Sequence, residues 1–152
     1  MRAGELCVRD VVTARSDESV VEVARRMASL DVGDVIVVEE RAGRLPHPIG
    51  IATDRDLVVH VLAHADRVPA TTKLADVMGR ELVLATEDDD VHAVLEKMRA
   101  HSIRRIPIVD RDGGLQGVLS IDDVLGMLRQ DIEIATKLLA SQGRGPLHRA
   151  RR

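Results

Sequence analysis

One short stretch occurs twice in this chain, and this repeat restricts the possible fold more than any other feature. The first copy is Gly50-Ile51-Ala52-Thr53-Asp54-Arg55-Asp56, and the second is Gly117-Val118-Leu119-Ser120-Ile121-Asp122-Asp123. Each copy contains a glycine, two apolar residues, a hydroxyl residue, two variable residues and an aspartate. Each also lies where an apolar, strand-like run gives way to an amphipathic pattern. The sequence therefore indicates a duplicated unit that carries a duplicated polar signature.

Other patterns in the chain repeat at nearly the same distance. An apolar stripe at helical spacing over residues 20–27 recurs 71 positions later over residues 91–98, and the β-branched run 35–38 recurs as 106–109. We also match residues 76–78 (Asp-Val-Met) with residues 10–12 (Asp-Val-Val). After the tight turn at 110–114 the offset falls to 67, because the corresponding loop of the first half is four residues longer.

Each half predicts the order helix, strand, strand, helix, and a sheet of two such short strands is marginal by itself. We expect the halves to pack face to face about a pseudo-twofold axis, with two clefts between them. A further helix is predicted over 131–142, and its apolar stripe either packs on the chain's own core or pairs with a partner chain. The predicted units are residues 1–66, residues 67–130, and residues 131–152 as a C-terminal helix with a basic tail.

Composition and charge exclude several classes of protein. Phe, Tyr and Trp are absent, which excludes aromatic stacking platforms for single-stranded nucleic acid. The net charge of −3 predicts no general attraction to nucleic acid or to an anionic membrane. The arginine-rich residues 144–152 are interpreted as a solvated, disordered end. Cys7 is the only cysteine, and no signal peptide or membrane-spanning apolar run is found, so we expect a cytoplasmic location.

The repeated signature has two interpretations. A hydroxyl residue followed three positions later by a carboxylate is a capping box, which any helix start can use. The same geometry suits a nucleotide, because the carboxylate can accept hydrogen bonds from two vicinal ribose hydroxyls and the hydroxyl can contact phosphate. The glycine either permits close backbone packing or brings the backbone near a base edge.

Taken together, these motifs resemble a tandem pair of CBS domains, the module named after cystathionine β-synthase. The pieces that carry the resemblance are residues 76–78, residues 103–110 (Ile-Arg-Arg-Ile-Pro-Ile-Val-Asp) and the two signature copies, in order. The resemblance implies an α+β fold of two β-α-β-β-α motifs. It also implies regulation rather than catalysis, a homodimer, and binding of an adenosine-containing ligand such as AMP, ADP, ATP, S-adenosylmethionine or NAD.

The resemblance also implies which residues bind the ligand. Asp56 and Asp123 would hold ribose hydroxyls, and Thr53 and Ser120 would contact ribose or phosphate. The remaining candidates would pair with phosphate or line the adenine: Arg104, Arg105, Asp122, Val12, Val32, Gly33 and Asp34. Because Arg104-Arg105 corresponds to Gly33-Asp34 in the first half, we predict tighter nucleotide binding in the cleft that contains Ser120, Asp123 and Arg105.

Other candidate sites are weaker. His60 and His64 have a spacing that can chelate zinc but lack an obvious third ligand, residues 88–90 (Asp-Asp-Asp) suit helix capping, and Cys7 lacks a partner base. With no acid–base or nucleophile set, we expect no enzyme activity, no metal site and no required cofactor. The sequence thus favours a regulatory module that acts on an unidentified partner protein. The alternative is a dimeric interaction or scaffold protein with vestigial clefts.

Overall fold

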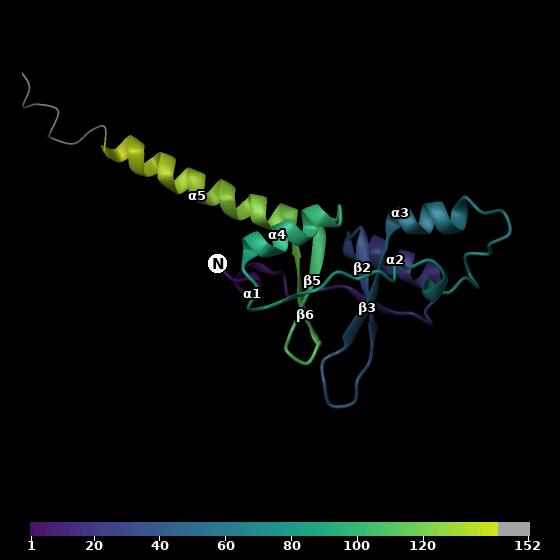
Figure 1. Ribbon diagram of the computed structural model, residues 1–152. Helices are drawn as coiled ribbons and strands as arrows, with labels where there is room; N and C mark the ends of the chain where they lie inside the picture. Colours follow the sequence, from purple (N-terminus) through teal and green to yellow (C-terminus); the bar gives the residue numbers. More distant parts are fainter. Residues whose placement is uncertain (143–152) are drawn as a thin grey trace, which may run out of the picture.

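The computed structural model of the chain describes residues 1–142, in which two halves of matching architecture lie side by side (Figure 1). The elements follow the repeat in chain order. They are α1 (Ala3–Leu6), β1 (Thr13–Arg15), α2 (Val20–Leu30), β2 (Asp34–Glu39), β3 (His47–Thr53), α3 (Asp54–Leu57), a π-helical turn (Val58–Leu62), a 3₁₀ turn (Leu74–Asp76), β4 (Ala85–Thr86), α4 (Val91–Ala100), β5 (Arg105–Val109), β6 (Leu115–Ser120) and α5 (Ile121–Gln142).

Each half contains a three-stranded sheet, ordered β1-β2-β3 in the first and β4-β5-β6 in the second. The middle strand is parallel to the first strand and antiparallel to the third. The middle strands are the predicted β-branched runs, and the side chains of Val35, Val37, Ile106 and Ile108 are at most 1% exposed. The α+β fold of two β-α-β-β-α motifs is therefore confirmed, although apolar periodicity alone missed the short strands β1 and β4.

Each half has its own aliphatic core. In the first half, the predicted stripe of α2 packs on β2 through Val23, which is fully buried, and Met27. In the second half, the equivalent stripe of α4 packs on β5 through Val94, also fully buried, and Met98. Without aromatic residues, both cores depend on close packing of branched side chains, which gives two small rigid bodies with a boundary between them.

The segment that precedes each half packs on the other half. Ala3 of α1 is fully buried in the core of the second half, and its N–H donates to the carbonyl oxygen of Asp89 at 2.8 Å. Leu74 is equally buried in the core of the first half, and its N–H donates to the carbonyl oxygen of Glu18 at 2.9 Å. The lead segments, residues 3–13 before the first half and residues 74–84 before the second, are thus exchanged at their starts, which ties the two halves together.

This exchange corrects one detail of the predicted repeat. Ala3 and Leu74 are 71 positions apart, the same offset as the helices, so residues 74–79 correspond to residues 3–8. Our match of residues 76–78 with residues 10–12 is therefore wrong. The equivalent of 76–78 is Glu5-Leu6-Cys7, because Leu6 and Cys7 pack on the second core as Val77 and Met78 pack on the first.

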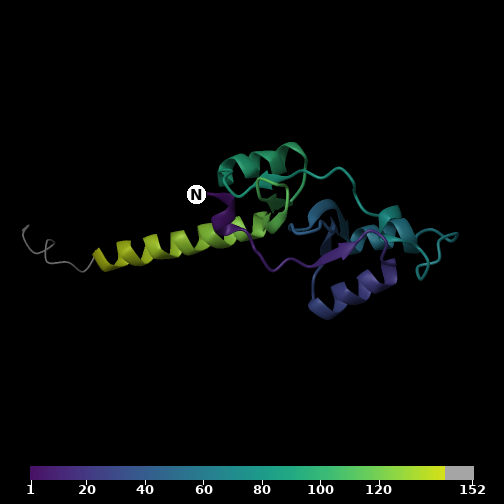
Figure 2. The same cartoon turned by 90° about the horizontal axis from the view of Figure 1, so that it is seen from below.

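Helix α5 is a single continuous helix, whereas the sequence predicted one helix from Ser120 and a further helical stretch over 131–142. The residues between them, 128–131, contain no glycine or proline that would end the first helix. Figures 1 and 2 both show α5 projecting away from the two halves. Over residues 1–142, no helix has both the length and the apolar character that a bilayer crossing requires. The predicted basic tail, 144–152, lies outside the described residues.

Candidate ligand-binding clefts

Both copies of the signature form the same hydrogen-bond pattern at a helix start. The N–H and hydroxyl of Thr53 each donate to Oδ2 of Asp56 at 2.8 Å, and the N–H of Asp56 donates to Thr53 Oγ1 at 3.1 Å. Ser120 and Asp123 repeat this pattern at 2.8, 2.5 and 3.2 Å. The capping interpretation is confirmed for both copies. In the described part of the chain, Oδ1 of each aspartate accepts no hydrogen bond, so this oxygen can accept one from a ligand.

The glycine of each copy allows a lead segment to cross directly against a strand. A Cβ on Gly50 would stand 2.7 Å from the carbonyl oxygen of Gly79, and a Cβ on Gly117 would stand 2.7 Å from that of Val8. Paired backbone hydrogen bonds of 2.9–3.2 Å fix both crossings. The close-packing interpretation of these glycines is therefore confirmed, and the chain itself fills the space that a base edge could have used.

The cleft at the second copy, called the Ser120 cleft below, is a cavity of about 220 Å³ between the halves. This volume is below the roughly 300–1,000 Å³ of typical small-molecule sites. The cavity brings together six predicted residues, namely Val12, Val32, Asp34, Arg105, Ser120 and Asp123. Its other lining residues are Val8, Asp10, Val11, Ile36 and Val118.

The cleft at the first copy, called the Thr53 cleft below, is a cavity of about 670 Å³. Its walls are the symmetry equivalents of the Ser120 cleft, since Glu81 to Val83 occupy the places of Asp10 to Val12 at the 71-residue offset. Among residues 1–142, it also carries three guanidinium groups, whereas the Ser120 cleft carries that of Arg105 alone. The predicted residues that line it are Gly33, Asp34, Thr53, Asp56, Arg104 and Arg105, and the others are Ile51, Asp54, Arg55, Gly79, Glu81, Leu82, Val83, Ser102 and Ile103.

Arg105 and Asp34 form an ion pair between the halves and line both cavities. They occupy equivalent positions of the repeat, 71 residues apart, and each opens the middle strand of its sheet. The side chain of Asp34 is only 15% exposed, and that of Arg105 is 39% exposed. The charge of Arg105 is therefore balanced by Asp34, and a ligand phosphate in either cleft must compete with this carboxylate.

The structure does not bring both arginines to Ser120, where the sequence placed them. Arg104 lines the Thr53 cleft only, whereas Arg105 lines both cavities. Its guanidinium is 76% exposed and lies 3.5 Å from Oδ1 of Asp122. Asp122 itself lines neither cavity. The predicted arginine pair is thus complete in the Thr53 cleft, and only Arg105 reaches the Ser120 cleft.

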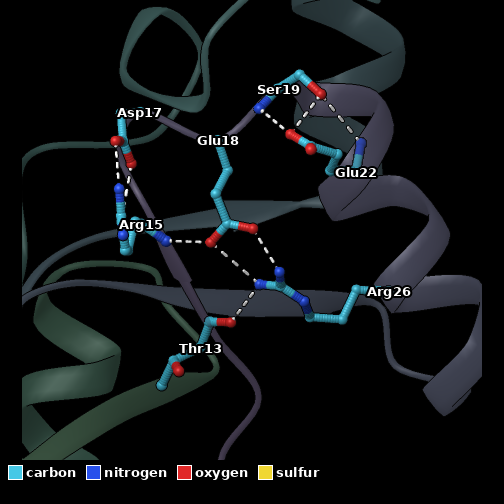
Figure 3. Close-up of polar contacts among 7 residues, drawn as sticks. All are labelled: Thr13, Arg15, Asp17, Glu18, Ser19, Glu22 and Arg26. Atoms are coloured by element: carbon cyan, nitrogen blue, oxygen red, sulfur yellow. Dashed lines mark hydrogen bonds and ion pairs between the residues drawn. The ribbon is translucent and has the colours of Figure 1, made fainter.

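An equivalent polar clamp holds the lead segment that lines each cleft. In the first half, Arg26 of α2 donates to the carbonyl oxygen of Thr13 at 2.7 Å and pairs with Glu18 (Figure 3). In the second half, Lys97 of α4 donates to the carbonyl oxygen of Leu84 at 3.4 Å and to Oδ2 of Asp89 at 2.8 Å. All three positions are related by the offset of 71, so the two walls are fixed by the same device.

These ion pairs lower the pKa of both carboxyl groups. Burial pushes the pKa of Glu18 upward, but hydrogen bonds from Arg26 and from the N–H of Arg15, with the charge of Arg26, bring it below its ordinary value. The hydrogen bond from Lys97 is the main cause of the lowered pKa of Asp89. Both groups therefore stay ionised at neutral pH and keep the clamps closed.

The sequence analysis missed several residues of the Thr53 cleft. They include Arg55, which stands inside the signature itself, and Glu81, Val83 and Ile103. The signal that could have found them is the repeat, because the 71-residue offset carries Val12 to Val83 and Val32 to Ile103.

The remaining candidates are the histidine pair, residues 88–90 and Cys7, and the structure shows what surrounds them. Nε2 of His60 lies 3.9 Å from Oδ1 of Asp56, and no group of three metal-ligating side chains gathers anywhere within residues 1–142. Asp90 caps α4 by accepting from the N–H of His92 at 2.9 Å, which confirms the capping interpretation of residues 88–90. Burial is the main cause of the raised pKa of the Cys7 thiol, which disfavours the reactive thiolate.

A duplicated α+β unit with two symmetry-related clefts defines the class of tandem-motif modules. The family model described as CBS domain matches residues 3–63 and again residues 74–130. The chain therefore belongs to the CBS-domain family, and the resemblance seen in the sequence is confirmed. Proteins with such paired motifs are regulatory modules, and several bind adenosine-containing ligands.

Three similar proteins illustrate the range of this family. The uncharacterized protein MK0525 of Methanopyrus kandleri is 36% identical over 122 residues, which cover 80% of this chain and 60% of that protein. The uncharacterized protein YlbB of Bacillus subtilis is 33% identical over 143 residues, 91% of this chain and 92% of that protein. The cytosolic domain of the Mg²⁺ channel MgtE in complex with ATP is 30% identical, with a TM-score of 0.67, over 83% of this chain and 48% of that one.

Proposed function

We propose that this protein is a regulatory module that binds AMP, ADP, ATP or a similar adenosine-containing ligand in the Thr53 cleft. One observation carries the proposal. This cleft combines a cavity of about 670 Å³ with a carboxylate oxygen available to ribose and three arginines, of which Arg105 must exchange the carboxylate of Asp34 for phosphate. No cofactor is required in this proposal, because the nucleotide acts as a regulatory ligand.

Each part of such a ligand has a matching group in the Thr53 cleft. Oδ1 of Asp56 is free to accept from the ribose hydroxyls while Oδ2 retains the helix cap. Arg55 and Arg104 can form charge-assisted hydrogen bonds to phosphate oxygens. The aliphatic side chains of Val83 and Ile103 also line the cavity, and in a chain without aromatic residues they suit the faces of an adenine ring.

The proposal reverses the preference for the Ser120 cleft that the sequence suggested. That preference depended on Arg104 and Arg105 acting together behind Ser120, but Arg104 lines the other cleft. The Ser120 cleft combines Arg105 with three carboxylates, those of Asp10, Asp34 and Asp123, in a cavity of about 220 Å³, whereas the Thr53 cleft combines three arginines with four, those of Asp34, Asp54, Asp56 and Glu81. In this proposal, the Ser120 cleft binds at most a second ligand, which lacks phosphate and binds with lower affinity.

Binding would act by a shift in conformational populations. A ligand that contacts Asp56 in one half and Arg104 in the other favours the arrangement in which both contacts exist, and this changes how the module meets a partner. The complex of MgtE with ATP, a structure 30% identical to this chain, supports a nucleotide as the ligand class. We propose a regulatory rather than catalytic role, a protein partner that delivers the output, and a cytoplasmic location, which suits a chain with a single cysteine.

We further propose that the protein is a homodimer. Val58, Val59 and Leu62 form an apolar surface on the first half, where they are 53%, 42% and 69% exposed. Exposed apolar patches of this kind mark interaction surfaces. The same surface favours the second candidate function, an interaction or scaffold protein in which the clefts hold no ligand.

A thermal-unfolding screen separates these two functions. The protein would be heated with AMP, ADP, ATP, S-adenosylmethionine or NADH, and unfolding followed by circular dichroism because the chain lacks Trp and Tyr. A ligand at about 100 times its Kd should raise the Tm by roughly 5–11 °C for a chain of this size. If none of the five ligands raises the Tm, the scaffold function replaces the regulatory one.

A further inference from the structure

Helix α5 leaves most of its length uncovered. Val124 near its start is buried in the core of the second half, whereas every described residue from Leu128 to Ser141 is exposed. Figures 1 and 2 show this part of α5 extending away from both halves. Yet it carries large apolar side chains, with Ile132 67% exposed and Leu139 71% exposed. An isolated helix that exposes such residues to water is unfavourable unless a partner covers them.

Five of the exposed apolar residues follow the spacing of a coiled coil, whereas Ile134 and Leu138 lie outside it. Leu125, Leu128, Ile132, Ala135 and Leu139 alternate at steps of three, four, three and four residues. This is the heptad pattern in which each side chain inserts between four side chains of a second helix. The seam formed by these five residues begins where the helix leaves the body of the protein. The spacing therefore specifies another helix as the partner, because a sheet edge or a small ligand would require no such repeat.

The seam is complementary to itself when two copies run antiparallel. In that register Leu128 faces Leu139 of the partner subunit, and Ile132 faces Ala135 of the partner subunit. The Ile132–Ala135 layers then combine a large with a small side chain, and no layer contains two small side chains. A parallel register would place two alanines in one layer and leave a cavity there.

The charges along the chain favour the same direction. Asp122 and Asp123 stand in the first turn of α5, and the sequence after the described part of the helix carries Arg144, Arg149, Arg151 and Arg152. An antiparallel pair brings the acidic start of one helix to the end of the other, from which the basic sequence continues. A parallel pair would instead bring the two basic segments together, which costs electrostatic energy.

We propose that residues 125–139 of α5 pair with the same segment of a second copy as an antiparallel two-helix coiled coil. This proposal deepens the homodimer part of the proposed function by adding α5 to the apolar surface of Val58, Val59 and Leu62 as a surface through which two copies associate. It does not depend on the ligand in the Thr53 cleft. The globular parts of the two copies lie at opposite ends of the paired helices, so their clefts stay open to ligand.

The first test compares two substitutions of equal exposure on the same helix. Ile132→Glu places a charge in the seam, whereas Ile134→Glu places it outside the seam at a residue that is 66% exposed. Sedimentation equilibrium of the full chain should show a dimer Kd raised roughly thirtyfold or more by Ile132→Glu, the size expected for a central interface residue, and little change for Ile134→Glu. Equal dissociation constants for the two variants, or a monomeric native protein, would overturn the proposal.

Folding and ligand binding are controlled within the same experiment. Both positions lie outside the two cores, so nucleotide titration should give native values for both variants, and any loss of helical circular dichroism in Ile132→Glu should not exceed the contribution of the uncovered part of α5. Loss of the dimer with intact nucleotide binding separates this proposal from the proposed function. Intact dimer with no nucleotide binding would overturn the proposed function and leave the coiled coil in place.

The second test determines the direction of the helices. In a Cys7→Ser background, Leu128→Cys and Leu139→Cys proteins would be oxidised separately and as a mixture. The antiparallel pair predicts a disulfide between the two different variants in the mixture and little cross-linking within either one. Rapid cross-linking of Leu128→Cys with itself would show a parallel pair and overturn the proposed register.

Discussion

The Thr53 cleft and the Ser120 cleft are built from equivalent residues of one repeat, yet they differ in volume and in charge. The former is a cavity of about 670 Å³ with three arginines, and the latter is a cavity of about 220 Å³ with one. The lead segments that wall them are held by equivalent clamps, Arg26 with Glu18 and Lys97 with Asp89. The difference therefore does not arise from how the walls are fixed.

The difference in arginines arises partly where each middle strand begins, and partly at Arg55, whose equivalent in the second signature is Asp122. Gly33 and Asp34 stand where the other half has Arg104 and Arg105, and the charged pair Asp34–Arg105 forms between the halves. Because Arg104 lies at the cleft of the opposite half, an arginine pair encoded in one motif adds positive charge to the binding site of the other. In a duplicated module, a charge change in one copy can thus alter the cleft that belongs to its neighbour.

The largest expected effect comes from removing the carboxylate that is proposed to bind ribose in each cleft. Asp56→Ala should weaken binding of AMP or ATP by about 30- to 100-fold, the loss expected for hydrogen bonds to a charged group. Asp123→Ala should change the affinity less than about threefold if the Ser120 cleft binds no phosphate ligand. Isothermal titration calorimetry of both variants measures this comparison directly.

The pair of variants contains its own control. Each aspartate caps a helix through the same three hydrogen bonds, so each substitution should lower stability by a similar amount, about 1 kcal/mol. Any difference in affinity then reports on the clefts and not on folding. A greater loss in Asp123→Ala would restore the preference for the Ser120 cleft, and equal losses would show that the two clefts are equivalent.

A smaller effect of opposite sign is expected at the ion pair between the halves. Asp34→Asn removes the carboxylate that competes for Arg105, so ATP affinity should rise by about five- to tenfold while adenosine affinity stays unchanged. Asp122→Asn is the matched control, because it removes a carboxylate from Arg104 in an exposed pair and should change affinity less than about twofold. Calorimetry with both ligands measures the difference.

Weaker ATP binding by Asp34→Asn would contradict this expectation. It would show that the carboxylate of Asp34 positions the guanidinium of Arg105 for phosphate and does not compete with it. The Ser120 cleft would then regain the role of a phosphate site, since Arg105 also lines that cavity.

Much of the fold could be predicted from the sequence because its main signals are periodic. The stripes of α2 and α4 and the β-branched runs of β2 and β5 stand out from the surrounding polar residues. The strands β1 and β4 could not be predicted from periodicity, because they have only three and two residues, too few to show an alternating pattern. The crossing of Ala3 onto the second half also left no local signal, because it depends on contacts between segments far apart in the sequence.

The candidate site was predicted by residue identity better than by placement. The sequence selected the two signature aspartates and the arginine pair as candidates, and the structure brings six of the predicted residues to each cavity. The sequence could not assign Arg104 to a cleft, because the assignment depends on the direction in which this side chain leaves the segment before β5. The pairing of Arg105 with Asp34 was likewise hidden, since it depends on the distance between two halves.

The smallest expected effect concerns the clamps of the two walls and their dependence on pH. The pKa values of Glu18 and Asp89 are lowered from 4.5 and 3.8, so each carboxylate stabilises the folded state above these values, and this stabilisation is lost as the pH falls through the lowered pKa. Glu18→Gln should reduce the free energy of unfolding at pH 7 by about 1 kcal/mol and by less at pH 3. Asp89→Asn should have a smaller effect, because Lys97 is more exposed than Arg26.

Urea titrations at both pH values measure these differences, and nucleotide titrations of the same variants test the comparison of the clefts. Since the clamps are equivalent, neither substitution should change the affinity of the Thr53 cleft by more than about twofold. A large loss of nucleotide binding in Asp89→Asn alone would show that the wall at Glu81 to Val83, which Lys97 holds, decides the preference between the clefts. The residues at the start of the two middle strands would then not suffice to explain the difference between the clefts.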